Sequence, residues 1–266
     1  MHGDTLYCLG DSLFRYIPSL NKWESVCKPE PLTSDPQSTS EMIFLKDKLY
    51  AMQTYFANAA DTYEIHFDGT VHELQMWRQN GYAGAKYIKP AGDCGWCYVR
   101  GQYYCGGFFT FDGTAFTELK NGLTSEEWNR PPTNSMAIKN DTLFAGFRKP
   151  GSIKYLNNGT WTAYTDTLPL SKNKNLKLSW LRAEPTAITF VKNRLFAATH
   201  ILGVLEWVKG KGWVLISDGL VKIPPPDMDY DPVVFLESIN NTLVAAYGQP
   251  GYAPWGGVGV YKLHVN

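Results

Sequence analysis

The sequence lacks an excess of charge of either sign, long apolar runs and helical periodicity. Its 266 residues carry 25 Lys+Arg and 25 Asp+Glu, so the formal net charge is zero. Because phosphate binding needs a basic excess, this balance argues against nucleic-acid binding. No apolar run approaches the roughly 20 residues of a membrane span, so we expect no membrane insertion. Residues 1–4 carry no signal-peptide features, and we expect a cytoplasmic or virion-associated protein.

Motifs of catalysis are also missing. The sequence has no Ser nucleophile elbow, no phosphate-binding loop and no paired carboxylates on a predicted inner strand. We therefore predict no catalytic residue and no cofactor, and we favour a protein that is not an enzyme.

Cysteine usage points away from a disulfide scaffold. The five cysteines are an odd number, which favours free thiols in a reducing compartment. Cys94-Gly-Trp-Cys97 with Cys105 has no fourth zinc ligand nearby. Cys97 and Cys105 flank a predicted hairpin turn at Arg100–Gly101, so a cross-strand pair is an alternative to buried thiols.

One acidic run resembles the start of a calcium loop. Asp227, Asp229 and Asp231 alternate there, and a hard cation binds several carboxylate oxygens. However, the sixth position of such a loop is Pro232 instead of Gly, and the twelfth is Ser238 instead of Glu. We predict a solvated acidic loop and no metal site, with these three aspartates as the candidates if a metal is bound.

Aromatic and turn-forming residues are abundant. The chain has 9 Trp, 16 Tyr, 13 Phe, 24 Gly and 16 Pro, a composition typical of short strands joined by turns. A polar turn followed by a large apolar residue and small apolar residues recurs six times. A further strand, a Gly/Asn/Lys turn and a strand opening with Trp or another large residue follow most copies. The equivalent positions are Leu6, Leu49, Tyr103, Leu143, Leu195 and Leu243.

These repeats predict an all-β fold, a β-propeller of six blades with mostly four antiparallel strands each. One such sheet cannot bury both faces alone, whereas blades packed around an axis bury them, with aromatic residues between. The first repeat begins at its second strand and the last ends after its third, which predicts 22 strands instead of 24 and termini close in space. We predict a single domain, 1–266, with repeats at about 1–34, 40–77, 92–123, 133–170, 185–220 and 232–266.

The first repeat, Leu6–Glu24, resembles a kelch repeat, a family with a Gly pair after the second strand, a Tyr on the third and a Trp shortly after. The Gly pair stands in the third repeat as Gly106-Gly107, while the first has Gly10-Asp11. The later repeats are similar to the propellers of bacterial sensor ectodomains and of phage receptor-binding tail proteins. The resemblance implies the fold only, because propellers carry unrelated functions.

The long connections are predicted to lie on one face. In a propeller the second-to-third and fourth-to-first connections emerge together, and here these are the long ones. Trp and Tyr beside Arg are typical of interface hot spots and of sugar-stacking platforms, although they could instead cap the open end of the core. The candidate ligand-binding residues are Tyr55, Phe56, Trp77, Arg78, Tyr82, Trp128, Arg130, Trp180, Arg182, His200, Tyr230, Tyr252 and Trp255.

These patterns favour a non-catalytic recognition module that binds a glycan or a partner protein through the long-loop face. A lectin-like or virion receptor-binding adhesin fits this description. A glycan-active hydrolase or lyase is the alternative, because Arg78, Arg130, Arg148 and Arg182 fall on successive repeats. A third hypothesis is an assembly scaffold, as a homo-oligomer or as part of a larger assembly.

Overall fold

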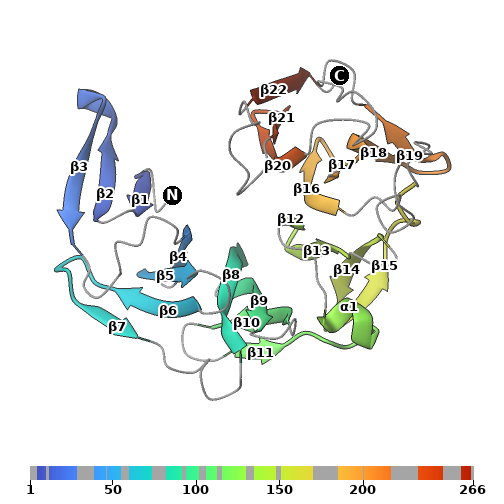
Figure 1. Cartoon of the computed structure of the whole chain (residues 1–266). Helices are drawn as coiled ribbons and strands as arrows, with labels where there is room; N and C mark the ends of the chain where they lie inside the picture. Colours follow the sequence, from blue (N-terminus) through green and yellow to red (C-terminus); the bar gives the residue numbers. More distant parts are fainter. Residues whose placement is uncertain are drawn as a thin grey trace. The chain divides into compact units, whose positions relative to one another are not determined.

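A computed structural model describes most of the chain (Figure 1). The described residues are 5–9, 12–28, 39–45, 47–54, 60–73, 82–91, 94–101, 106–112, 116–129, 135–147, 151–169, 185–199, 201–216, 233–247 and 259–264.

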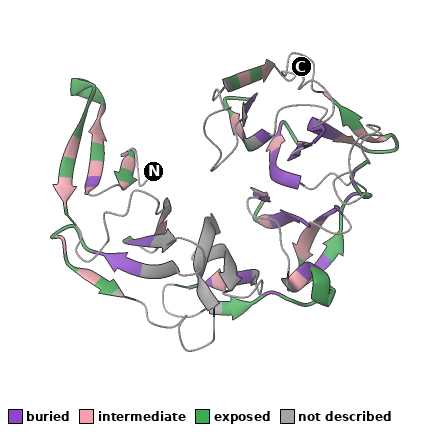
Figure 2. Cartoon of the chain, in the orientation of Figure 1, coloured by how far each residue is buried: buried purple, intermediate pink, exposed green. Residues whose placement is uncertain are grey.

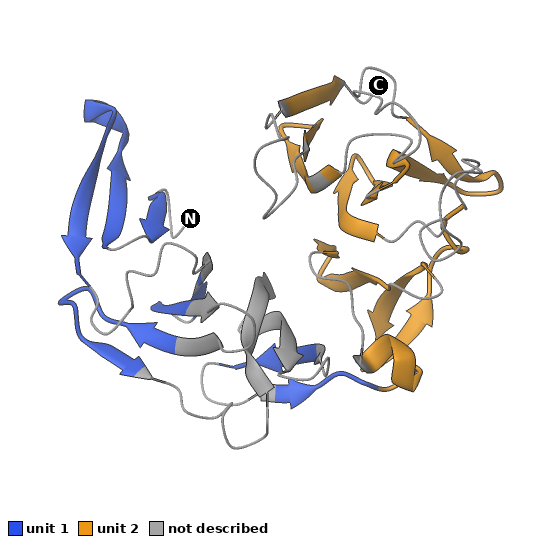
Figure 3. Ribbon diagram, viewed as in Figure 1, with its two compact units in different colours: residues 1–120 blue, residues 121–266 orange. Residues whose placement is uncertain are grey.

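The described residues form six antiparallel sheets, three in each of two compact units (Figure 3). Unit 1 is Met1–Lys120 and unit 2 is Asn121–Asn266. The all-β propeller class is confirmed, and the described residues contain the predicted 22 strands, with three-stranded first and last sheets. That the two units make the single predicted domain stays a prediction.

The sheets of unit 1 follow the chain in order. They are β1 (Tyr7–Leu9), β2 (Leu13–Ile17) and β3 (Lys22–Cys27); then β4 (Thr39–Leu45), β5 (Lys48–Thr54), β6 (Ala60–Ile65) and β7 (Val71–Glu73); then β8 (Tyr82–Ala91), β9 (Cys94–Gly101), β10 (Gly106–Phe111) and β11 (Phe116–Glu118).

Unit 2 repeats this arrangement after a short helix, α1 (Ser125–Asn129). Its sheets are β12 (Met136–Lys139), β13 (Thr142–Gly146), β14 (Ile153–Asn157) and β15 (Thr160–Ala163); then β16 (Pro185–Val191), β17 (Arg194–Thr199), β18 (Gly203–Val208) and β19 (Gly212–Leu215); then β20 (Val233–Ile239), β21 (Thr242–Tyr247) and β22 (Gly259–His264).

Two-residue turns set the register of the first hairpin in each sheet of unit 2. Asn140 and Asp141 both have positive φ, 46° and 55°, and the same holds for Lys192–Asn193 and Asn240–Asn241. Positive φ at both positions is the conformation whose twist matches that of two paired strands. The turn therefore fixes which side chains of the following strand face each neighbouring sheet.

In the sheet β16–β19, the strands β16, β17 and most of β18 are buried on both faces, while β19 is more exposed (Figure 2). Leu195 and Ala197 point to one face and pack with Phe144 of β13. Phe196 and Ala198 alternate with them and pack with residues of β20 and β21 such as Leu243. Because successive strand residues point to opposite faces, one strand supplies both layers of core.

The core of unit 1 is built in the same way. Leu13 of the first sheet packs with Leu49, Tyr63 and Ile65 of the second. Tyr50 meets Phe111 of the third sheet edge to face, with ring centroids 5.1 Å apart.

In the third sheet, β8–β11, the strands and turns lie at other residues than the repeat pattern predicts. Arg100–Gly101 is not a turn, because Arg100 pairs with Gly106 and Gly101 with Tyr82. The first strand of this sheet is β8, which begins at Tyr82, and its last residue, Ala91, pairs with Cys94 at the start of β9. Gly92-Asp93 separates these two strands in the sequence, and this turn-forming dipeptide is the signal for the observed phase.

Because Arg100–Gly101 is not a hairpin turn, the reason for pairing Cys97 with Cys105 no longer holds. Cys97 lies inside β9, opposite Ile88 and Phe109, and not beside a hairpin turn. Cys105 lies outside the described residues.

Candidate functional site

The connection from β11 to β12 contains α1, which carries Trp128. This connection is one of the long loops in which the sequence predicts ligand contacts, and Trp128 is partly exposed there. A reciprocal cap starts the helix. The Glu127 N–H donates to Thr124 Oγ1 at 3.2 Å, and the Thr124 N–H donates to Glu127 Oε2 at 2.8 Å. These bonds satisfy two amides that the start of a helix leaves without partners.

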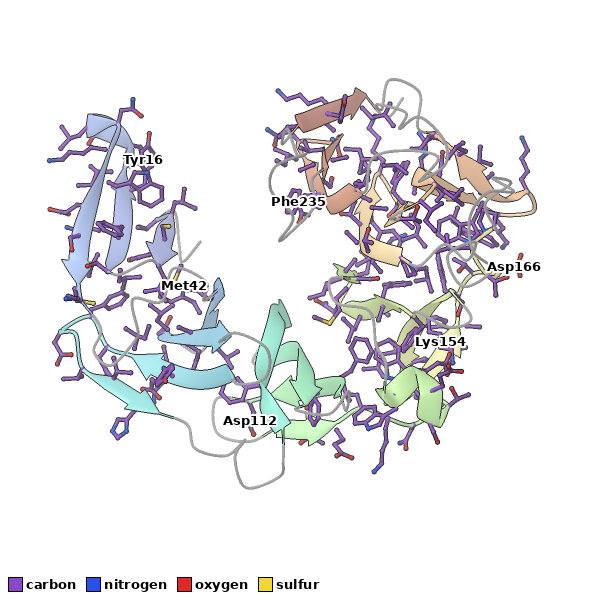
Figure 4. The ribbon with its side chains drawn as sticks, viewed as in Figure 1. Tyr16, Met42, Asp112, Lys154, Asp166 and Phe235 are labelled. Carbon is purple, nitrogen blue, oxygen red and sulfur yellow. The ribbon has the colours of Figure 1, made fainter. Side chains whose placement is uncertain are left out.

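A buried ion pair ties this helix to the sheet β12–β15. Lys154 Nζ of β14 lies 2.7 Å from Glu127 Oε1, and the two side chains are 14% and 3% exposed. Figure 4 labels Lys154. The same ammonium donates to the Gly122 carbonyl at 3.2 Å. It also lies 5.5 Å from the centre of the Phe147 ring. Such a pair is tolerated in the interior because each charge has several partners.

The residues before the helix are pressed against β15. The Trp161 N–H donates to the Asn121 carbonyl at 2.8 Å. Gly122 has φ +82°, and a Cβ there would lie 2.4 Å from the Trp161 carbonyl oxygen. Only glycine fits this backbone and this approach. The start of the connection is therefore attached to its sheet through backbone contacts.

Together these contacts hold a partly exposed indole on an anchored support. The Trp128 N–H donates to the Thr124 carbonyl at 2.9 Å, which links its backbone to the cap. The nearby carboxylate, Glu127, is engaged by Lys154 and Thr124. The buried carboxylate of Glu127 therefore already has partners within the structure.

Of the other predicted ligand-binding residues, only Tyr82 lies among the described residues. Tyr82 is the first residue of β8, opposite Gly101, and so lies in a strand and not in the long connection. The rest lie outside the described residues: Tyr55, Phe56, Trp77, Arg78, Arg130, Trp180, Arg182, His200, Tyr230, Tyr252 and Trp255, with the calcium candidates Asp227, Asp229 and Asp231.

The residues on either side of His200 are anchored. The Leu202 N–H donates to Thr199 Oγ1 at 2.8 Å. Ile201 and Leu202 are buried in the core between two sheets of unit 2. The short connection from β17 to β18 is thus supported by packing at both ends.

A polar cluster in unit 1 contains His66, which directly follows β6, and His72 of β7. His66 Nε2 lies 3.3 Å from Glu64 Oε1, and the His66 and His72 ring centroids are 6.3 Å apart. Lys48 Nζ is 3.0 Å from the same carboxylate, and this hydrogen bond raises the pKa of Lys48. No group of three or more His, Cys, Asp or Glu among the described residues could hold a metal ion.

Cys27 lies beside this cluster as a free thiol. Its Sγ is 3.7 Å from the His66 carbonyl oxygen. Burial, with a smaller contribution from the charge of Asp68, raises the pKa of the Cys27 thiol. A raised pKa disfavours the thiolate, which is the nucleophilic form of cysteine.

Sequence comparisons find no relative. No protein-family model matches the chain, and no curated protein matches it. Within the described residues, no helix has the length and apolar character needed to cross a membrane.

Structural comparison finds propellers. The chain is similar to regucalcin, a calcium-binding protein from Agrobacterium tumefaciens, with a TM-score of 0.53, 10% identity, and coverage of 98% of this chain and 86% of that one. A protein described as a gluconolactonase gives 0.50 and 8%, covering 89% and 78%. The extracellular domain of a protein described as a hybrid two-component system from B. thetaiotaomicron gives 0.50 and 10%, covering 81% of this chain.

These similarities show the fold alone, since the identities are so low. The chain spans about a quarter of the length of the extracellular domain from B. thetaiotaomicron, 26%. The resemblance to bacterial sensor ectodomains is confirmed at the level of the fold. None of the three proteins is described as a kelch protein, a lectin or a virion protein, so those expectations have no support here.

Sequence reasoning placed Trp128 in the site but missed its supports. Thr124-Ser-Glu-Glu127 carries the capping-box pattern, which was a readable signal for α1. No sequence signal identifies Lys154 as the partner of Glu127, because that contact arises from tertiary packing.

Proposed function

We propose that the chain is a non-catalytic recognition module that binds a glycan or a partner protein through its long connections. The observation that carries the proposal is the anchored α1, which presents a partly exposed Trp128. An aromatic side chain on a support that is already ordered loses little conformational entropy on binding. Trp is also among the residues that contribute most to binding energy in interfaces.

A glycan is the first ligand to test. An indole offers a flat apolar surface for the C–H face of a sugar ring. The engagement of Glu127 by Lys154 supports binding over hydrolysis, since a glycosidase needs two available carboxyl groups.

The similar structures suggest calcium as a variable in the binding experiment, but they assign no ligand to this chain. Regucalcin is a calcium-binding protein, and propellers carry many unrelated functions. In this chain the run Asp227, Asp229 and Asp231 is the segment to which a calcium effect would be assigned.

A glycan array probed with the labelled full chain, with and without EDTA, tests this proposal. Specific signal on a defined set of sugars is the expected result. Loss of signal with EDTA would assign a metal role to the aspartate run. Release of sugar products would favour the hydrolase alternative. A blank array would contradict glycan binding and favour a protein-docking scaffold.

A further inference from the structure

We propose that Glu127 and Lys154 are positioning residues, which hold α1 in the conformation in which Trp128 binds ligand. This inference rests on the proposed function. Neither charged group needs to touch the ligand for this role.

The first step is that α1 depends on external contacts. It has five residues, and isolated helices shorter than about 12 residues are marginal in water. Its order therefore depends on its cap and on its tie to β14.

The second step is that one carboxylate serves both contacts. Glu127 Oε2 accepts the Thr124 N–H at 2.8 Å, while Oε1 faces Lys154 Nζ at 2.7 Å. The side chain of Glu127 is 3% exposed, so water cannot readily replace a lost ammonium. Without Lys154 the buried carboxylate would be driven towards solvent, and the cap would break with it.

The third step links the cap to Trp128. The Trp128 N–H donates to the Thr124 carbonyl, and the Glu127 N–H donates to the Thr124 hydroxyl. Lys154 also holds the Gly122 carbonyl at 3.2 Å, ahead of the cap. Removal of the ammonium thus frees the segment at Gly122 and at Glu127, on both sides of Thr124.

The test uses four variants of the full chain. Glu127→Gln turns an amide nitrogen or a neutral oxygen towards the ammonium. Lys154→Met keeps the apolar stem over Phe147 and removes the charge. The double variant leaves no unpaired buried charge. Glu206→Gln is the matched control, because it breaks the Arg194–Glu206 pair elsewhere in unit 2.

Two readouts follow α1 directly and need no ligand. They are hydrogen exchange of the peptide covering 121–129 and hydroxyl-radical footprinting of Trp128. We expect at least tenfold faster exchange and increased Trp128 oxidation in both single variants. The double variant should recover to within about threefold of the parent protein, and Glu206→Gln should leave both readouts unchanged. Parent-like exchange in the single variants would overturn the proposal, as would equal loss in the control.

Binding to the glycan array separates this inference from the proposed function. Loss of signal in both single variants with recovery in the double variant is the expected result. Full signal in the single variants, together with loss in Trp128→Ala, would overturn the positioning role. Full signal in Trp128→Ala as well would show that the glycan binds elsewhere on the chain, which would overturn the role of Trp128 and with it the positioning role of Glu127 and Lys154. If the parent array is blank, glycan binding fails, and exchange still decides whether the pair orders α1.

Discussion

The sheets β16–β19 and β20–β22 have the same pairing register but opposite exposure on one face. Both first hairpins contain the same irregularity, between Pro185 and Ala187 in one and between Val233 and Phe235 in the other. The next strands also correspond, since Ala198 pairs with Val204 as Ala246 pairs with Val260.

Three matched positions show the difference. Val204 is 3% exposed and Val260 is 63% exposed, although both are valines on the third strand of their sheet. The buried set is Ala187, Val191 and Val204, which packs against β20–β22, and the exposed set is Phe235, Ile239 and Val260. Figure 4 labels Phe235 on β20. The comparison teaches that these positions of β16–β18 are core because β20–β22 pack against them.

The largest expected effect is a charge at the buried valine. Val204→Asp should reduce the free energy of unfolding by more than about 3 kcal/mol, because a carboxylate would be buried without a partner. Val260→Asp is the matched control and should change it by less than about 0.5 kcal/mol. Chemical denaturation of the full chain measures both. Equal losses would mean that the face of β20–β22 is covered in solution.

The second expected effect concerns the ion pair on the same face. Arg194 contacts Glu206 with two nitrogen atoms, at 2.6 and 2.8 Å. Arg194→Met leaves the largely buried Glu206 unpaired and should lower the free energy of unfolding by about 1–2 kcal/mol. At the position matching Glu206, Lys262 is exposed, so Lys262→Met should change it by less than about 0.5 kcal/mol. A comparable loss in both variants would show that exposure is not the deciding difference.

A smaller effect is expected at the turns that begin β17 and β21. Lys192 has φ 48° where Asn240 has φ 50°, and Asn tolerates this left-handed region better than Lys. Lys192→Asn should therefore raise the free energy of unfolding by about 0.5 kcal/mol, and Asn240→Lys should lower it by a similar amount. Thermal denaturation of the reciprocal pair tests this, and shifts of the same sign would refute it.

The smallest effect extends the comparison to unit 1, where Lys48–Glu64 has the same register as Arg194–Glu206. The hydrogen bond with Glu64 raises the pKa of Lys48 above 10.5. Because the pKa of Lys48 is higher in the folded protein, the pair contributes to the free energy of unfolding. This contribution is fully present below pH 10.5 and is lost as the pH rises through the folded-state pKa. Lys48→Arg should retain that contribution to higher pH. Denaturation midpoints measured from about pH 9 to about pH 12 should diverge, and parallel curves would contradict this account.

Much of the fold could be predicted because the repeat carries three signals at once. Turn residues and alternating apolar residues recur in each repeat, and a strand with Trp or Phe near its start follows most of them, which predicts the number of strands. In the third repeat the pattern predicts the wrong strand boundaries, because Gly95 stands where the other repeats have Leu49 or Leu195, and Gly101 resembles a turn residue. The exposure of Val260 could not be predicted, because the same pattern is buried in the sheet before it.

The candidate site was predictable in part for similar reasons. Loop length and composition placed Trp128 in a connection, and the cap at Thr124 has a local signature. The tie from Glu127 to Lys154 spans two elements and depends on how α1 packs. Local patterns do not contain such contacts.

The most direct test of the recognition function compares two tryptophan variants on the same glycan array. Trp128→Ala removes the indole from α1, while Trp23→Ala removes one that is 46% exposed on β3, outside the long connections. The account predicts that Trp128→Ala loses at least tenfold in signal, and that Trp23→Ala and the parent protein bind alike. Undiminished binding by a folded Trp128→Ala variant would contradict the account.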